Sequence, residues 1–305
     1  MDCLVTKLKS AVNDDTLSQL GVLHLFQPYV KSESNDYIFM RLIAGDKPIT
    51  VRTDGTLKVH SFSTDASSLL IEANHAEEFY VVNKVGGSNI WIDGVYDIKY
   101  LQLGGQLFYS QREYDVLGYV KLLRGLFIGQ SPTVETTVTL DANDLQNAWF
   151  ISIPNEYTIS NIRKLLDNKD IISLRLSAEK SQNFTMDDFQ NFNNLQELYN
   201  VPGNFSKLPK SIRLYTQTES STYTGSVEDF VANQRSAGRT SGAVKLVWMK
   251  YFKGITFEDK ILQTWWSEKG YSENDGFISW DSSSITVTNV QPESYVAPDN
   301  YNVLL

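Results

Sequence analysis

The sequence predicts an α+β protein in which an all-β module is followed by an α/β module with an irregular repeat. Residues 1–140 contain short β-branched and aromatic runs between turn residues, a pattern typical of strands. In residues 141–290, short helical segments alternate with apolar strands. Residues 291–305 contain two prolines and no hydrophobic periodicity, so we expect an extended C-terminal tail. A chain of 305 residues is long enough for two cores.

The N-terminal module, residues 1–140, is predicted to be a sandwich or a barrel-like sheet, and the sequence leaves both open. Strand patterns at 51–53 and 57–62 flank Asp54-Gly55, a dipeptide that favours a type I′ hairpin turn because it tolerates positive φ. Residues 37–43 form a further apolar run between turn residues. Such spacing is typical of antiparallel β modules.

Helix signals are clearest in the second module. Thr185 precedes two acidic residues in the way of an N-cap, where the helix dipole favours negative charge. Residues 226–237 are predicted to be a helix, with Ser226 as its cap and Gly238 as its left-handed stop. Strands are expected at 171–176, 243–248, 277–280 and 284–288.

Part of this module resembles a degenerate leucine-rich repeat, whose strand pattern is L-x-x-L-x-L. Residues 171–176 fit the pattern fully, and residues 195–200 and 209–214 fit it in part. The asparagine that usually follows the pattern is replaced by Glu179, Gly203 and Gln217. The starts are 24 and 14 residues apart, so an ordinary α/β domain with leucine-containing strands remains the alternative.

Composition argues against several classes of function. The net charge is −9, whereas a protein that binds a phosphate backbone needs a clustered basic surface, so no nucleic-acid partner is expected. No apolar run approaches the ~18 residues of a membrane span, so no membrane insertion is expected. Cys3 is the only cysteine and cannot form an intrachain disulfide. The first residues lack a secretory signal, which predicts a protein made in the cytoplasm.

Catalytic and metal signatures are missing from the sequence. The three histidines lie in or beside predicted strands, and none stands in a nucleophile elbow. Residues 72–78 gather three carboxylates and His75, but without a known metal-ligand spacing. We therefore predict a protein that is not an enzyme and that has no catalytic, cofactor-binding or metal-binding residues and no cofactor.

Aromatic residues in predicted loops and in the tail are candidate protein-interface residues. Exposed aromatic side chains are enriched at protein–protein contacts. The alternative is packing beneath a long loop. The residues concerned are Trp265, Trp266, Tyr271, Tyr295 and Tyr301.

Three segments share motifs with one group of proteins. Residues 4–21 contain L-V-T-K-L-K, an Asn/Asp-rich stretch and L-x-x-L-G. Residues 223–240 contain G-S-V-E-x-F-V-x-x-Q-x-x-x-G-R, and residues 280–287 give a weaker match. With these motifs the chain resembles uncharacterised structural or appendage proteins of Bacteroidota phages, the crAss-like group in particular. The resemblance implies a β module followed by a leucine-rich-like module, and no active site.

The hypothesis from the sequence is a virion structural protein, a head or tail appendage or accessory component, made in the host cytoplasm. Its partners would be other virion proteins and copies of itself, with a host-surface glycan or receptor as a further partner. Residues 1–140 would serve assembly and anchoring, and the segment 4–21 would become ordered on a partner. Its candidate interface residues are Leu4, Leu8, Leu17 and Leu20. The alternatives are a leucine-rich surface adhesion or recognition module and a glycan-active depolymerase.

Overall fold

The protein is built mostly from β strands, with few helices. The structure is a computed structural model, and it describes residues 29–32, 37–59, 64–82, 88–94, 98–103, 112–114, 124–128, 139–155, 157–216, 223–247, 275–299 and 304. Within these ranges, no helix is long and apolar enough to cross a membrane.

Sixteen of the described strands form one sheet. The N-terminal strands are β1 (Tyr29–Ser32), β2 (Tyr37–Ala44), β3 (Ile49–Val59), β4 (Thr64–Ile71), β5 (Ala76–Val82), β6 (Ser88–Asp93), β7 (Ile98–Leu103), β8 (Arg112–Tyr114) and β9 (Gly125–Ile128). The sheet continues through β11 (Phe150–Ile153), β13 (Ser173–Leu176), β14 (Glu197–Tyr199), β16 (Leu214–Thr216), β18 (Gly242–Val247), β19 (Gly276–Trp280) and β20 (Ile285–Thr288).

Two short parallel pairs lie outside this sheet. They join β10 (Thr139–Asp141) to β12 (Thr158–Ser160), and β15 (Gly203–Asn204) to β17 (Tyr223–Thr224). The α-helices described are α3 (Ala178–Ser181) and α4 (Val227–Ser236). The 3₁₀ helices are η4 (Ala142–Leu145), η5 (Ile162–Asp167), η6 (Met186–Phe189) and η7 (Phe205–Lys207).

The N-terminal strands pair in antiparallel fashion around β3, which contacts β4, β5 and β6. The hairpin turn predicted at Asp54-Gly55 is wrong, because both residues lie inside β3. The register of β3 against β4 shifts between Arg52 and Leu57, as at a β-bulge. Gly55 fits there for lack of a side chain, since a Cβ would come within 2.6 Å of the Val82 carbonyl oxygen.

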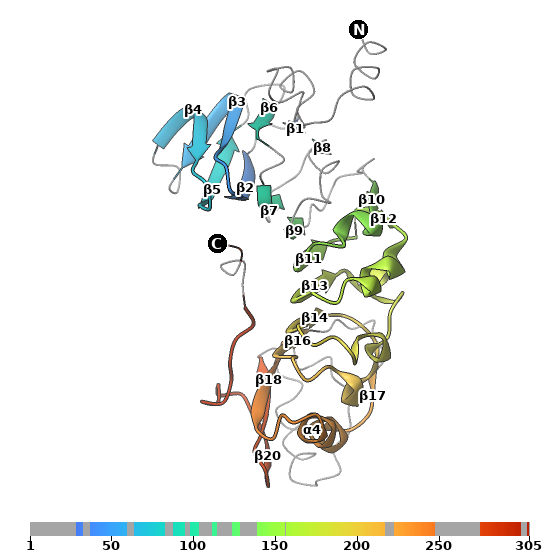
Figure 1. Cartoon of the computed structure of the whole chain (residues 1–305). Helices are drawn as coiled ribbons and strands as arrows, with labels where there is room; N and C mark the ends of the chain where they lie inside the picture. Colours follow the sequence, from blue (N-terminus) through green and yellow to red (C-terminus); the bar gives the residue numbers. More distant parts are fainter. Residues whose placement is uncertain are drawn as a thin grey trace.

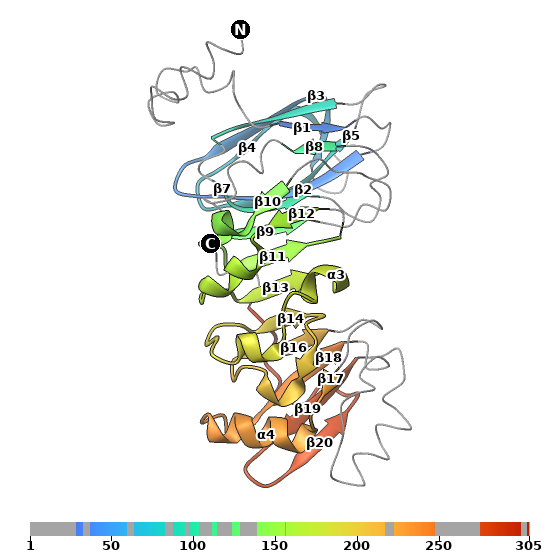
Figure 2. The same ribbon diagram turned by 90° about the vertical axis from the view of Figure 1, so that its right-hand side faces the viewer.

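A parallel ladder runs from β7 to β18 and joins the N-terminal strands to the C-terminal end of an elongated molecule (Figures 1 and 2). Its strands pair in register, and successive aligned residues are 25, 25, 23, 24, 17 and 31 positions apart. These aligned residues are Tyr100, Gly125, Phe150, Ser173, Glu197, Leu214 and Lys245. Most turns of the ladder therefore use a similar length of chain.

One column of the ladder supplies the main core. Its members belong to the same buried cluster as residues of α4 and the 3₁₀ segments, and all are at most 1% exposed. They are Leu101, Ile151, Leu174, Leu198, Tyr215 and Leu246. The expected frame of the segment 209–214 is wrong by three residues, because Tyr215 and not Ile212 pairs with Leu198, while Leu214 stands opposite Glu197.

Asparagines satisfy backbone groups within this core. Asn200 adopts a left-handed conformation at φ +62°, and its side chain donates to the Leu176 carbonyl oxygen at 2.9 Å. Asn168 donates to the carbonyl oxygens of Leu145 and Ala148. Both asparagines lie at positions other than those where the repeat pattern predicts one, which are 179, 203 and 217. Since buried carbonyl groups need hydrogen-bond donors, these amides stabilise the turns between strands.

The predicted caps of the second module are confirmed. Thr185 and Asp188 form a capping box on η6, and the Thr185 backbone N–H donates to the Asp188 carboxylate at 2.8 Å. Helix α4 begins after Ser226, whose hydroxyl accepts from the Asp229 backbone N–H at 3.0 Å. Gly238, at φ +89°, follows the end of the helix.

Candidate functional site

The sheet face opposite the helices carries the candidate site. Its aligned residues Tyr100, Phe150, Ser173 and Glu197 are all at most 9% exposed, although none of the described helices covers this face (Figure 2). The C-terminal segment, residues 289–299, runs along this face in Figure 1 and forms hydrogen bonds with Gln196 and Arg213. The face therefore combines a strand ladder with a covering peptide from the same chain.

A buried carboxylate lies at the centre of this face. Glu197 on β14 has a side chain only 6% exposed, and it accepts a hydrogen bond from the Ser173 hydroxyl at 2.5 Å. Arg175 on β13 donates to both of its oxygens, at 2.8 and 2.9 Å from one nitrogen, and the Tyr199 hydroxyl donates at 3.1 Å. Arg175 also lies over the Tyr199 ring at 5.1 Å. Both oxygens of the carboxylate are thus bonded, by donors from β13 and from β14 itself.

This arrangement shifts the titration of its neighbours. Burial disfavours the charged guanidinium of Arg175, but the adjacent Glu197 carboxylate outweighs it and raises the pKa of Arg175. Burial and the charge of Glu197 raise the pKa of Tyr199 to about 12. The same two causes raise the pKa of Tyr295 in the tail to about 12. These groups therefore keep their charge states through the neutral range.

The tail is attached to the ladder by specific bonds. The Gln196 side chain donates to Asp299 Oδ2 at 2.6 Å and accepts from the Asp299 backbone N–H at 2.9 Å. Arg213 donates to the Ala297 carbonyl oxygen at 3.0 Å. Tyr295 packs edge-on against Phe277, with ring centroids 5.0 Å apart. These contacts hold the tail as an extended segment on the sheet face of its own chain.

Leu304 attaches the far end of the tail. It is 3% exposed and packs in a small cluster with Ile43, Tyr100 and Phe150. Ile43 belongs to the N-terminal antiparallel strands, and Phe150 belongs to the ladder. The tail thus contacts both the last strands of the molecule and the junction of its two sheet regions.

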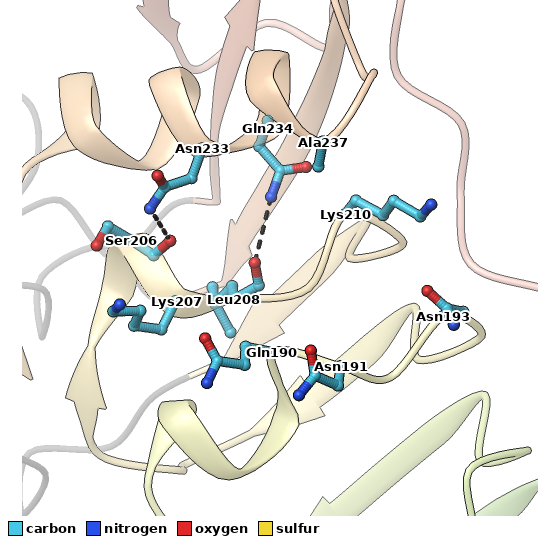
Figure 3. Close-up of a pocket in the computed structure, with 10 residues that line it drawn as sticks. All are labelled: Gln190, Asn191, Asn193, Ser206, Lys207, Leu208, Lys210, Asn233, Gln234 and Ala237. Carbon is cyan, nitrogen blue, oxygen red and sulfur yellow. Dashed lines mark hydrogen bonds between the residues drawn. The ribbon is translucent and has the colours of Figure 1, made fainter.

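Two polar pockets lie beside α4 and the turns that precede β14 and β16. The larger, about 510 Å³, is lined by amide and lysine side chains together with Ser206, Leu208 and Ala237 (Figure 3). Asn233 and Gln234 build its wall by donating to the carbonyl oxygens of Ser206 and Leu208. The smaller, about 320 Å³, lies between residues 193–196, the turn 210–213 and the tail.

Of the predicted interface residues, one falls within the described part of the chain. Tyr295 is half-buried and packs edge-on against Phe277. The others lie outside the described residues and are Leu4, Leu8, Leu17, Leu20, Trp265, Trp266, Tyr271 and Tyr301.

A depolymerase would need two carboxylates across a cleft, and four acidic residues of the second module are available for it: Asp187, Asp188, Glu197 and Glu228. Asp188 caps η6 and pairs with Arg163 at 2.8 Å, and Asp187 lies in the first turn of the same segment. Glu228 lies in the first turn of α4, and Glu197 lies under Arg175. Within the described ranges, no group of three or more His, Cys, Asp or Glu side chains is placed to hold a metal ion.

Comparison with known proteins does not assign the chain to a family. No family model, no curated protein and no solved structure matches the chain.

Proposed function

We propose that this chain is a phage virion structural protein, a head or tail appendage or accessory component, which acts by docking and self-association and not by catalysis. The observation that carries the proposal is the unbroken sheet from β8 to β20, in which the antiparallel strands and the ladder share one set of hydrogen bonds. Such a sheet transmits load between its ends without a flexible linker, which suits a part of a particle.

The ladder is proposed to be an irregular leucine-rich-repeat-like module. Strands that recur after 23–25 residues and bury one column of side chains are the physical basis of such arrays, because each repeat packs only on its neighbours. The interval of 17 residues before β16 and that of 31 before β18 make this array irregular. Helix α4, from the segment that resembles phage proteins, covers its C-terminal end.

The experiment is to purify particles from cells that produce the encoding phage and to search them for this chain by quantitative mass spectrometry. We expect the chain in the particle at a fixed ratio to the major capsid protein. Light scattering of the purified chain is expected to show an oligomer. A chain that is absent from particles and monomeric at high concentration would refute the proposal.

Anchoring through residues 4–21 is tested separately. A chain that lacks residues 1–21 should be made at normal levels but incorporated less into particles, because the apolar positions of this segment are proposed to bind a partner. Full-length chain expressed in parallel is the control. Equal incorporation of both forms would refute the anchoring role and leave the structural role to the rest of the chain.

A surface recognition module is the second candidate, and the polar pocket of Figure 3 favours it. Its lining of amides and lysines offers hydrogen-bond donors and acceptors to a polar ligand. This alternative predicts a monomer with an accessible binding face, so the same light-scattering measurement separates the two candidates.

A further inference from the structure

The smaller of the two pockets concentrates positive charge in an acidic protein. It has a volume of about 320 Å³, and its lining includes Lys210, Arg213 and Arg239 but no Asp or Glu. The chain as a whole has 36 acidic and 27 basic side chains. Three cations around one small pocket therefore reverse the average charge of the surface and favour an anionic ligand.

Arg239 is placed in this pocket by neutral partners. Its guanidinium donates to the Ile212 carbonyl oxygen at 2.7 Å and to the Ala243 carbonyl oxygen at 2.9 Å, and it lies over the Trp280 ring at 4.7 Å. Because carbonyl groups and a ring fix its position without cancelling its charge, the field of Arg239 extends into the pocket. Burial and the charge of Arg213 lower the pKa of Arg239 to about 10.

Arg213 forms the second cationic wall and is 30% exposed in its side chain. It donates to the Ala297 carbonyl oxygen, while the Asp299 carboxylate lies 3.9 Å away, beyond hydrogen-bond distance. A guanidinium carries five N–H donors in a planar fork, so Arg213 has donors left for a second oxyanion.

The rest of the lining is suited to hydroxyl groups. Asn193, Asn194, Ser211 and Ser241 contribute amides and hydroxyls, and the tail closes one side with Ser294 and Val296. Amide side chains both donate and accept, as sugar hydroxyls do. The pocket thus combines a site for one negative charge with several neutral polar groups.

We propose that this pocket binds an acidic saccharide residue, with its carboxylate between Lys210 and Arg213 and its hydroxyl groups on the amides of Asn193 and Asn194. The proposal does not depend on the structural role in a virion, because a chain that never enters a particle would bind in the same way. A polysaccharide and a free sugar acid would both offer the carboxylate and the hydroxyl groups. The affinity for a short oligomer of the acid, compared with that for the monomer, distinguishes these two sources.

The test is calorimetric titration of the full chain with D-glucuronate, D-glucose and acetate. We expect glucuronate to bind with a Kd of about 1 mM. Glucose lacks the carboxylate and acetate lacks the sugar hydroxyl groups, so each should bind at least about tenfold more weakly. A glucuronate oligomer that binds more tightly than the monomer would identify a polymer as the source. Equal affinity for glucose, or no heat with glucuronate up to about 20 mM, would overturn the proposal.

Variants locate the site. Arg213→Gln and Lys210→Gln should each weaken glucuronate binding about tenfold, as expected for loss of a charge-assisted bond. Lys47→Gln, which removes an exposed positive charge from the turn between β2 and β3, is the matched control and should bind like the parent. Circular dichroism checks each fold, and Lys210→Gln leaves the described tail contacts intact. If both pocket variants bind like Lys47→Gln, the pocket is not the site.

Discussion

Replacement of Glu197 by alanine tests how the open face of the ladder is held together. The change removes the acceptor of Ser173, Arg175 and Tyr199 at once. Breaking a buried ion pair from one side costs about 3–5 kcal/mol. The Arg175 side chain is 39% exposed, and water screens part of the lost interaction. We therefore expect the free energy of unfolding to fall by about 2 kcal/mol.

The assay is urea unfolding followed by tryptophan fluorescence, with Glu72→Ala as the matched control. Glu72 is exposed, so its loss should change stability by less than about 0.5 kcal/mol. A double variant, Glu197→Ala with Arg175→Met, should be more stable than Glu197→Ala alone, because no guanidinium is left without its carboxylate. If Glu197→Ala unfolds like Glu72→Ala, or if the double variant loses the sum of both effects, the cluster does not stabilise the face.

Three further predictions follow from particular contacts. Gly55→Ala should lower stability by about 1–3 kcal/mol through the clash with the Val82 carbonyl oxygen, and an unchanged melting temperature would contradict this close approach. Leu304→Ala should weaken tail docking by about 2 kcal/mol and speed proteolysis within residues 289–299, whereas cleavage at the parent rate would show that the tail docks without this side chain. Tyr199 has its pKa raised from 10.0 to about 12 in the folded chain, so the unfolded chain loses this proton first and stability falls as the pH rises through that window. Urea unfolding at about pH 10 and about pH 12 measures this loss of stability, which should be smaller in Tyr199→Phe than in the parent chain. An equal loss in both would show that Tyr199 is not the group responsible.

Much of the local structure could be predicted because its signals are local. The N-caps Thr185 and Ser226 and the stop at Gly238 depend on residues within one turn, so a single sequence contains the whole signal. The same applies to the run at 37–43, which forms β2. Asp54-Gly55 is not a turn, although the dipeptide favours one, because β5 and β6 pair with the two ends of β3 and keep this segment within the strand.

The first strands of the ladder were not predicted as part of the repeat, for a different reason. The pattern L-x-x-L-x-L also holds at Ile98, Leu101 and Leu103, and in a looser form at Ala148, Ile151 and Ile153. Both segments belong to strands that the structure places in the ladder. The repeat predicted from the sequence begins at residue 171 and leaves both segments out. A search with any aliphatic residue at the three positions would have found the interval of about 25 residues.

The sequence by itself determined that the chain is β-rich and where the capped segments of the second module begin, because these depend on near neighbours and on hydrophobic periodicity. Only the tertiary structure decided that one sheet joins both regions, that the tail returns to the open face, and that Glu197 meets Arg175. Gln196 and Asp299 are 103 positions apart in the sequence. No local pattern encodes such a pair, because the fold of every intervening strand is needed to bring its members together.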